Sequence, residues 1–156
     1  MNPNVISDDY NKLVIKLEEI SRLEGIMATM HWDQEVIMPK ASAENRSKQI
    51  ATLAGILHEK SIDIELGRLI DKLVNSNVSS YTKIQQCNIF EAKRDYELET
   101  KIPKKLVQQI AELGSRGHQI WTKAREENKY ENFSPTLERL IFLKKNLPVL
   151  DALFLE

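Results

Sequence analysis

Apolar residues in this 156-residue chain recur at intervals of three and four, the period of an amphipathic α-helix. The first such segment predicts a helix from near Asp8 to Trp32, with an inward face made of Leu13, Leu17, Ile20, Met27 and Met30. Gly25 weakens a helix by about 1 kcal/mol relative to alanine, so we expect a packing reason for it. Residues Asp33 to Pro39 are predicted to be a linker, because proline disfavours helical geometry in the residue before it.

Five more segments with helical spacing follow, and each begins with residues that suit a helix N-terminus. Their expected starts are a Ser42 cap, an Asp63 cap, the residues after Ser79-Ser80, Pro103 as a first helical residue, and a Ser134 cap followed by Pro135. The third helix is expected to bury Leu66, Leu69, Ile70 and Leu73. The fourth helix is expected to reach Lys101 and to turn these residues inward: Ile84, Cys87, Ala92 and Tyr96.

Glycines on the fifth helix and the absence of strand patterns complete the fold prediction. Gly114 and Gly117 share a face and would let another backbone approach closely. No strand-like alternation bounded by turn residues is visible, and no internal repeat. The sequence therefore predicts an all-α fold, an open bundle of about six helices that forms a single domain over residues 1–156.

Charge and composition narrow the possible partners. The chain has 22 basic and 23 acidic residues, so no positive surplus is available to bind a nucleic acid. No apolar run approaches the ~20 residues that a membrane helix needs, and the polar start Met1 to Asp9 is unlike a signal peptide. The single cysteine, Cys87, cannot form an internal disulfide and fits a reducing compartment. We expect a cytoplasmic protein that contacts neither nucleic acid nor membrane.

Three histidines are the first candidates for metal chemistry. His58-Glu59 is half of the His-Glu-x-x-His pattern with which a helix binds zinc, but Ile62 stands where the second histidine is needed. The simpler interpretation is a surface pair at a helix end. His118 stands alone, and we expect it to be packed or exposed rather than a ligand.

A second cluster lies at the end of the first predicted helix. His31, Asp33 and Glu35 could bind a cation together. The alternative is that Asp33 stabilises backbone N–H groups in the turn and that His31 favours the negative end of the helix dipole. This structural alternative is the one that we expect.

Nucleophilic chemistry has no better support in the sequence. Cys87 falls on an apolar helical stripe and is expected to be a buried, inert thiol. No serine lies in a Gly-x-Ser-x-Gly turn, and no glycine-rich phosphate loop occurs. Trp32 and Trp121 are expected to be core anchors. We therefore predict no catalytic, cofactor-binding or metal-binding residue in this chain.

Short motifs in fixed order nevertheless resemble a known family. They are Trp32-Asp33 with Met38-Pro39 and Arg46; Leu53-Ala54 with Leu57-His58-Glu59; Asp63 with Leu66-Gly67; Lys101-Ile102-Pro103 with Leu106-Val107; Trp121 with Ala124-Arg125 and Asn128; and Phe133, Pro135 and Leu137-Glu138. Over residues 10–145 this series resembles the start of the thermostable carboxypeptidase (carboxypeptidase Taq) family of metallopeptidases. Residues 146–156 are a divergent tail, either the product of a shifted frame or early stop, or an ordinary short helix.

The resemblance implies a function that this chain does not complete. Family members are expected to release the last residue of peptides with zinc or another divalent metal, held by a His-Glu-x-x-His helix and a later glutamate. It implies that all of these residues lie beyond Glu156, so the chain would be a truncated, inactive N-terminal part whose partner is a separate catalytic part or a second copy. The alternative is a stand-alone helical interaction module without catalysis.

Overall fold

The computed structural model describes residues 8–147 of the chain. Its elements are α1 (Asp8–Val36), η1 (Lys40–Ser42), α2 (Ala43–Ser61), α3 (Ile64–Val74), η2 (Val78–Ser80), α4 (Lys83–Glu99), α5 (Lys104–Glu126), η3 (Tyr130–Asn132) and α6 (Ser134–Lys145), where η marks a 3-10 helix. No strand occurs among the described residues, and the all-α prediction is confirmed. The start of the chain and most of the predicted tail at residues 146–156 lie outside the described residues.

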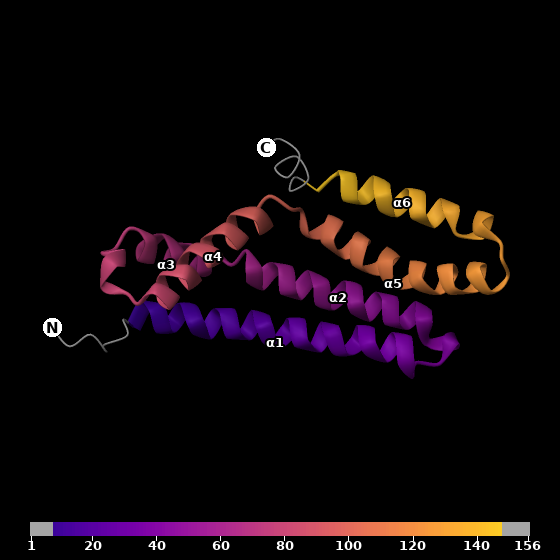
Figure 1. Cartoon of the computed structure of the whole chain (residues 1–156), viewed down its shortest axis with the longest axis horizontal. Helices are drawn as coiled ribbons and strands as arrows, with labels where there is room; N and C mark the ends of the chain where they lie inside the picture. The colour runs from indigo at the N-terminus through magenta and orange to yellow at the C-terminus, as the bar shows by residue number, and fades with distance from the viewer. Residues whose placement is uncertain (1–7, 148–156) are drawn as a thin grey trace.

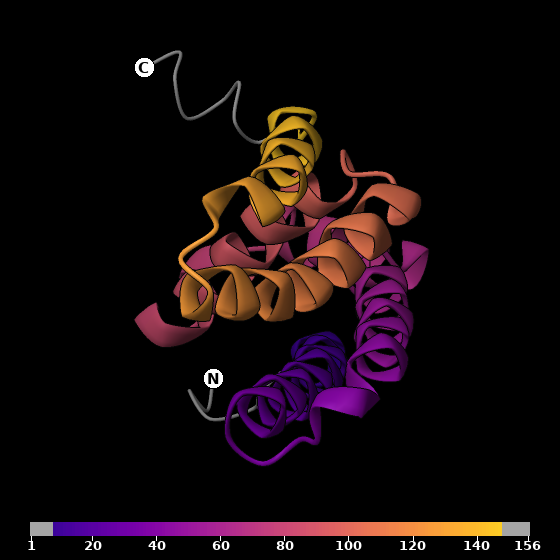
Figure 2. The ribbon, with the colours of Figure 1, turned by 90° about the vertical axis from the view of Figure 1, so that its right-hand side faces the viewer.

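The long helices form a stack with α1 and α6 as its outer members. α2 packs on α1, α5 packs on α2, and α6 packs on α5 (Figures 1 and 2). α3 and α4 pack against each other, and α3 also packs on α1 (Figure 1). No helix within residues 8–147 is long and apolar enough to cross a membrane.

The largest apolar cluster lies where α1, α3 and α4 meet, and we call this region the α1–α3–α4 end. Its buried members are Tyr10, Leu13, Leu66, Ile70, Leu73, Ile89 and Ala92. They recur at helical spacing within each helix, as expected for three amphipathic helices that share one core. The predicted inward positions on α3 are confirmed for Leu66, Ile70 and Leu73, whereas Leu69 is only half-buried.

The contact between α2 and α5, which we call the α2–α5 layer, uses smaller residues. Buried positions are Ser47, Ile50, Ala51, Ala54, Gly55 and His58 on α2, and Ser115, Gly117 and Ala124 on α5. A Cβ on Gly55 would lie 2.5 Å from the Gln108 side-chain nitrogen and 3.0 Å from Lys104 Cε. Small residues therefore let these two helices approach each other closely.

Several helix boundaries differ from the predicted ones. α1 continues to Val36, because Pro39 restricts only its immediate predecessor, and the N–H groups of Ile37 and Met38 both donate to the Asp33 carbonyl. The predicted linker therefore began four residues too early. Asp63 caps α3 as predicted, since its carboxylate accepts the Glu65 N–H at 3.0 Å.

At the other N-termini the predicted cap residues are confirmed only in part. Thr82 caps α4 in a reciprocal capping box with Gln85. Pro103 occupies the N-cap position of α5 instead of its first helical position. Ser134 is already helical and Phe133 is the N-cap of α6, so the predicted serine cap is wrong there. Ser42 is in the N-cap position of α2, although its side chain makes no capping bond.

The inward face of α4 was predicted only in part. Ala92 is buried and Tyr96 packs against the core, but Ile84 and Cys87 are exposed. The face that meets α1 and α3 passes through Ile89 and Ala92 instead. Cys87 lies two residues from Ile89, about 200° around the helix, so it faces the other way.

The three glycines singled out in the sequence have different surroundings. A Cβ on Gly117 would lie 3.2 Å from Thr136 Cγ2 and 3.5 Å from Leu140 Cδ1, so this glycine faces side chains of α6. Within the described residues, nothing lies within 4 Å of a Cβ built on Gly25 or on Gly114. The predicted close approach is therefore wrong for Gly114, and Gly25 has no packing reason among residues 8–147.

Candidate functional site

His58 is a buried residue of the α2–α5 layer and not a surface residue. Its side chain is 1% exposed, and Nδ1 lies 3.0 Å from Glu99 Oε2 at the end of α4. The prediction of a surface pair is wrong because His58 follows Ala54 by one helical turn on the buried face of α2. Glu59, about 100° further around, is exposed and accepts a hydrogen bond from Lys104 Nζ at 2.5 Å.

The hydrogen bond to Glu99 decides the orientation of the His58 ring. A carboxylate oxygen accepts hydrogen bonds, so Nδ1–H of His58 donates to Glu99 Oε2. Nε2 is buried and has no hydrogen-bond partner among the described residues. A buried polar atom without a partner costs about 1–3 kcal/mol, so the link that His58 makes between α2 and α4 carries this cost.

The cluster at the end of α1 is separated by helical geometry. Because α1 continues through these positions, Asp33 lies on the opposite side of the helix from His31 and Glu35, which are four residues apart and share a face. Asp33 Oδ2 lies 2.5 Å from Arg46 Nη2, Glu35 Oε1 lies 4.0 Å from His118 Nε2, and His31 is exposed. Asp33 does accept the N–H groups of the turn, but through its backbone carbonyl, because its carboxylate pairs with Arg46.

Arg46 joins the start of α2 to the end of α1. Besides the ion pair with Asp33, its Nη1 donates to the Met30 carbonyl at 2.8 Å and its Nε donates to Gln49 Oε1 at 3.2 Å. Its side chain is largely buried at 17% exposure. The Asp33 and Arg46 members of the sequence motif are therefore explained by helix packing rather than by chemistry.

A buried amide–hydroxyl pair joins α1 to α5. Ser115 Oγ donates to Gln34 Oε1, and Gln34 Nε2 donates to the Ser115 carbonyl at 3.3 Å. Both side chains are buried. Neither residue was predicted from the sequence, because 81 positions separate them and nothing in their spacing indicates a contact.

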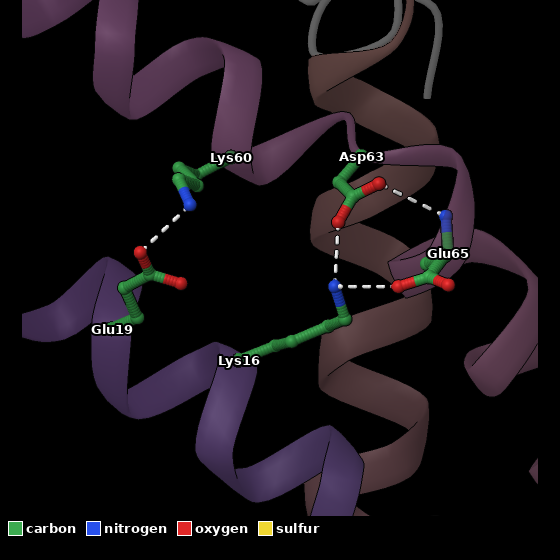
Figure 3. Close-up of polar contacts among 5 residues, drawn as sticks. All are labelled: Lys16, Glu19, Lys60, Asp63 and Glu65. Carbon is green, nitrogen blue, oxygen red and sulfur yellow. Dashed lines mark hydrogen bonds and ion pairs between the residues drawn. The ribbon is translucent and has the colours of Figure 1, made fainter.

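Ion pairs connect α1 to the turn between α2 and α3 (Figure 3). Lys16 Nζ lies 2.6 Å from Asp63 Oδ2 and 3.4 Å from Glu65 Oε2, and Lys60 Nζ lies 2.7 Å from Glu19 Oε1 (Figure 3). The hydrogen bond from Lys16, with that from the Glu65 N–H, lowers the pKa of Asp63 below its ordinary value. The same bond to Asp63 raises the pKa of Lys16.

Both tryptophans lie at the surface, so the prediction that they anchor the core is wrong. Trp32 is 57% exposed on α1, and Trp121 is 39% exposed on α5. Trp121 lies between two partners on the same helix: the His118 ring, 5.8 Å away between centroids, and the Arg125 guanidinium, 5.3 Å from its ring. Stacking of this kind stabilises an exposed ring without burying it.

The described residues do not assemble a metal centre. No three histidine, cysteine, aspartate or glutamate side chains among residues 8–147 lie close enough together to hold a metal ion. His58 and His118 are instead matched with single carboxylates on neighbouring helices. The side chains of residues 8–147 do not fit the metal that the family resemblance implies.

Comparison with known proteins shows that the chain is similar to part of several longer metallopeptidases. The profile of the carboxypeptidase Taq (M32) metallopeptidases matches residues 12–151. Thermostable carboxypeptidase 1 of Thermus thermophilus is 31% identical over 87% of this chain and 27% of its own length. Carboxypeptidase 1 of Bacillus subtilis is 30% identical over 83% of this chain and 26% of its own length.

Solved structures agree with these sequence matches. The BsuCP crystal structure superposes with a TM-score of 0.86 at 26% identity, over 90% of this chain and 28% of that one. The M32 carboxypeptidase of Deinococcus radiodurans R1 gives 0.67 at 28% identity, over 88% and 27%. The chain therefore belongs to the carboxypeptidase Taq (M32) family of metallopeptidases. It spans about a quarter of the length of the relatives it matches.

Proposed function

We propose that these residues form the structural N-terminal part of a metal-dependent carboxypeptidase that releases C-terminal residues from peptides. The observation that carries this proposal is the match of nearly the whole chain to about a quarter of each relative, in sequence and in fold. In this proposal, zinc or another divalent metal and the general base belong to the other three-quarters of the fold, and the helices described above support that part. A cytoplasmic location is part of the proposal, and the single cysteine is compatible with it.

The polar contacts of the chain support a structural role. The charged groups nearest to a catalytic pattern are each matched with a group on another helix: Asp33 with Arg46, Glu59 with Lys104, and His58 with Glu99. Such pairs fix the relative positions of helices and leave few free groups for acid–base work. The arrangement suits a scaffold against which a catalytic part can pack.

A hybrid enzyme tests the proposal. Residues 8–147 of this chain would replace the matched quarter of the Bacillus subtilis relative, and release of the terminal amino acid from a blocked dipeptide would be measured with zinc or cobalt present. We expect chelator-sensitive release by the hybrid and none by this chain alone. The control is the relative with its matched quarter deleted. Release by this chain alone, or a folded but inactive hybrid, would contradict the proposal.

A stand-alone interaction module is the second candidate, and exposed apolar side chains on α1 favour it. Ile26, Trp32 and Val36 are all more than half exposed. If the chain is such a module, it should bind a partner without restoring carboxypeptidase activity in the hybrid. The same experiment therefore separates the two candidates.

A further inference from the structure

A pocket lies where α5 is connected to α6, at one end of the stack of helices (Figure 1). We call it the α5–α6 pocket, and its volume is about 220 Å³. Aromatic, cationic and small side chains line it: Trp121, Ala124, Arg125, Asn128, Lys129, Tyr130 and Phe133. Five of these seven residues belong to the ordered motifs of the sequence, so the structure brings those motif positions together around one space.

The end of α5 explains why the lining residues meet. Asn128 has a left-handed backbone with φ of 54°, a conformation that asparagine adopts more readily than most residues. Its N–H donates to the Arg125 carbonyl at 3.2 Å, and the Lys129 N–H donates to the Ala124 carbonyl at 2.8 Å. These two bonds form a Schellman motif, which ends the helix and turns the chain back. Lys129 and Tyr130 therefore line the same pocket as Arg125.

The charges of the α5–α6 pocket favour an anion. Arg125 and Lys129 are its cations, and no aspartate or glutamate is among the lining residues. The Arg125 guanidinium lies 5.3 Å from the centre of the Trp121 ring and has no carboxylate partner within residues 8–147. Lys129 Nζ lies 3.8 Å from Glu127 Oε2, which is too long for a hydrogen bond. A guanidinium stacked on a ring keeps N–H groups at its edge for a planar anion.

The rings of the α5–α6 pocket favour an aromatic group beside that anion. Trp121 and Tyr130 are 39% and 65% exposed, and Phe133 is half-buried. Rings that line one pocket can stack on the ring of a ligand and exclude water from it. An apolar cavity of about 150 Å³ holds a benzene molecule. The α5–α6 pocket is larger, so it has room for one aromatic ring and a small charged group.

We propose that the α5–α6 pocket binds a small aromatic anion, one ring that carries a carboxylate or a phosphate group. The ligand ring packs against Trp121 and Tyr130, and the charged group accepts hydrogen bonds from Arg125 and Lys129. This role goes beyond the proposed carboxypeptidase function, because binding here requires neither a metal nor the other three-quarters of the M32 fold.

Fluorescence titration of the whole 156-residue chain tests the proposal. Trp32→Phe removes a tryptophan that is 57% exposed on α1 and leaves Trp121 as the single tryptophan, so the emission reports on the pocket. Phenylacetate and phenyl phosphate are the probes, and acetate and benzyl alcohol supply the charge and the ring separately. We expect the two probes to change the Trp121 emission with a Kd on the order of 1 mM. Acetate and benzyl alcohol should bind at least about tenfold more weakly.

Three substitutions in the Trp32→Phe chain locate the binding. Arg125→Gln removes the unpaired cation and Tyr130→Ala removes a ring, and each should weaken probe binding about tenfold. Lys123→Gln is the matched control, because Lys123 is also near the end of α5 and is 76% exposed but does not line the pocket. It should change the Kd by less than about twofold. Circular dichroism should be the same for all three variants, because all three side chains are exposed.

Each outcome supports or overturns the proposal. Binding that Arg125→Gln and Tyr130→Ala weaken and Lys123→Gln retains supports it, and the tighter probe then identifies the charged group. No saturable binding of either probe, or binding that Arg125→Gln leaves unchanged, overturns it. Acetate that binds as tightly as phenylacetate also overturns it, since the site would then be an unselective cationic surface. The titration measures no hydrolysis, so its failure is distinct from failure of the hybrid enzyme.

Discussion

The α1–α3–α4 end and the α2–α5 layer are held together by different means. Of the largest fully buried aliphatic side chains, four belong to the first region, Leu13, Ile70, Leu73 and Ile89, and one, Ile50, to the second. The α2–α5 layer relies on alanine, glycine and serine at its contact and on polar links at its edges. Side-chain volume stabilises the first region, whereas close backbone approach and satisfied polar groups stabilise the second.

The difference has a structural consequence. Large apolar side chains tolerate small shifts of a helix, but a buried polar pair holds only in one geometry. We infer that the α2–α5 layer fixes the relative placement of the long helices, and that the α1–α3–α4 end supplies most of the burial energy. Substitutions that act on one region alone can test this division.

The largest effect should come from the apolar end. Leu13→Ala removes a side chain with no exposed surface and should lower the free energy of unfolding by about 2–5 kcal/mol, through lost burial and the cavity that remains. Urea denaturation followed by circular dichroism measures it. The control is Ile15→Ala, which should change stability by less than about 0.5 kcal/mol. Equal losses for both variants would refute the assignment of Leu13 to the core.

The buried polar pair of Gln34 on α1 and Ser115 on α5, at the edge of the α2–α5 layer, should give the next largest effect. Ser115→Ala leaves Gln34 Oε1 buried without its donor and should cost about 1–3 kcal/mol in the same denaturation assay. The double variant Gln34→Met with Ser115→Ala removes both partners and should recover part of that loss. A double variant that simply adds the two single losses would show that the pair is not coupled.

A glycine-to-alanine substitution should have opposite signs at two sites. A Cβ on Gly67 would lie 2.6 Å from Tyr96 Cζ, so Gly67→Ala should destabilise the chain by about 1–3 kcal/mol. Gly25→Ala has open space and should stabilise the isolated chain by up to about 1 kcal/mol, because alanine favours the helix. Melting temperatures of the two variants measure both. A stabilising Gly67→Ala would mean that Tyr96 moves aside at little cost.

The smallest effect should be a pH dependence of stability that comes from the ion pair of Lys16 with Asp63 (Figure 3). The pKa of Asp63 is lowered in the folded chain. The ionised carboxylate therefore stabilises the fold fully at pH values above its ordinary pKa of 3.8, and this stabilisation is lost as the pH falls through the lowered pKa. For a partly exposed pair with Lys16 this is at most about 1 kcal/mol. Asp63→Asn keeps an N-cap but loses the charge. The difference in free energy of unfolding between wild type and Asp63→Asn should therefore shrink below pH 4. A difference that stays constant with pH would show that the ion pair of Asp63 with Lys16 does not stabilise the fold.

The predictions that the structure confirms are those that depend on the residues of a single helix. The apolar spacing of Leu66, Ile70 and Leu73 and the cap at Asp63 depend on residues within one or two turns, and both predictions are confirmed. The family was also identifiable, because an ordered series of short motifs is specific even when each member is weak. The absence of site residues from this chain and the division at residue 145 stay predictions.

Tertiary contacts decided everything that depends on which side of a helix is covered. His58 was expected at the surface and is buried because α4 and α5 enclose that turn of α2, whereas Cys87 and Trp32 were expected inside and are exposed because no described helix packs on their faces. The pairing of Gln34 with Ser115 depends on the placement of α1 against α5. Helical periodicity thus specifies faces from neighbours in the sequence, but only the packing of distant helices decides which faces are buried.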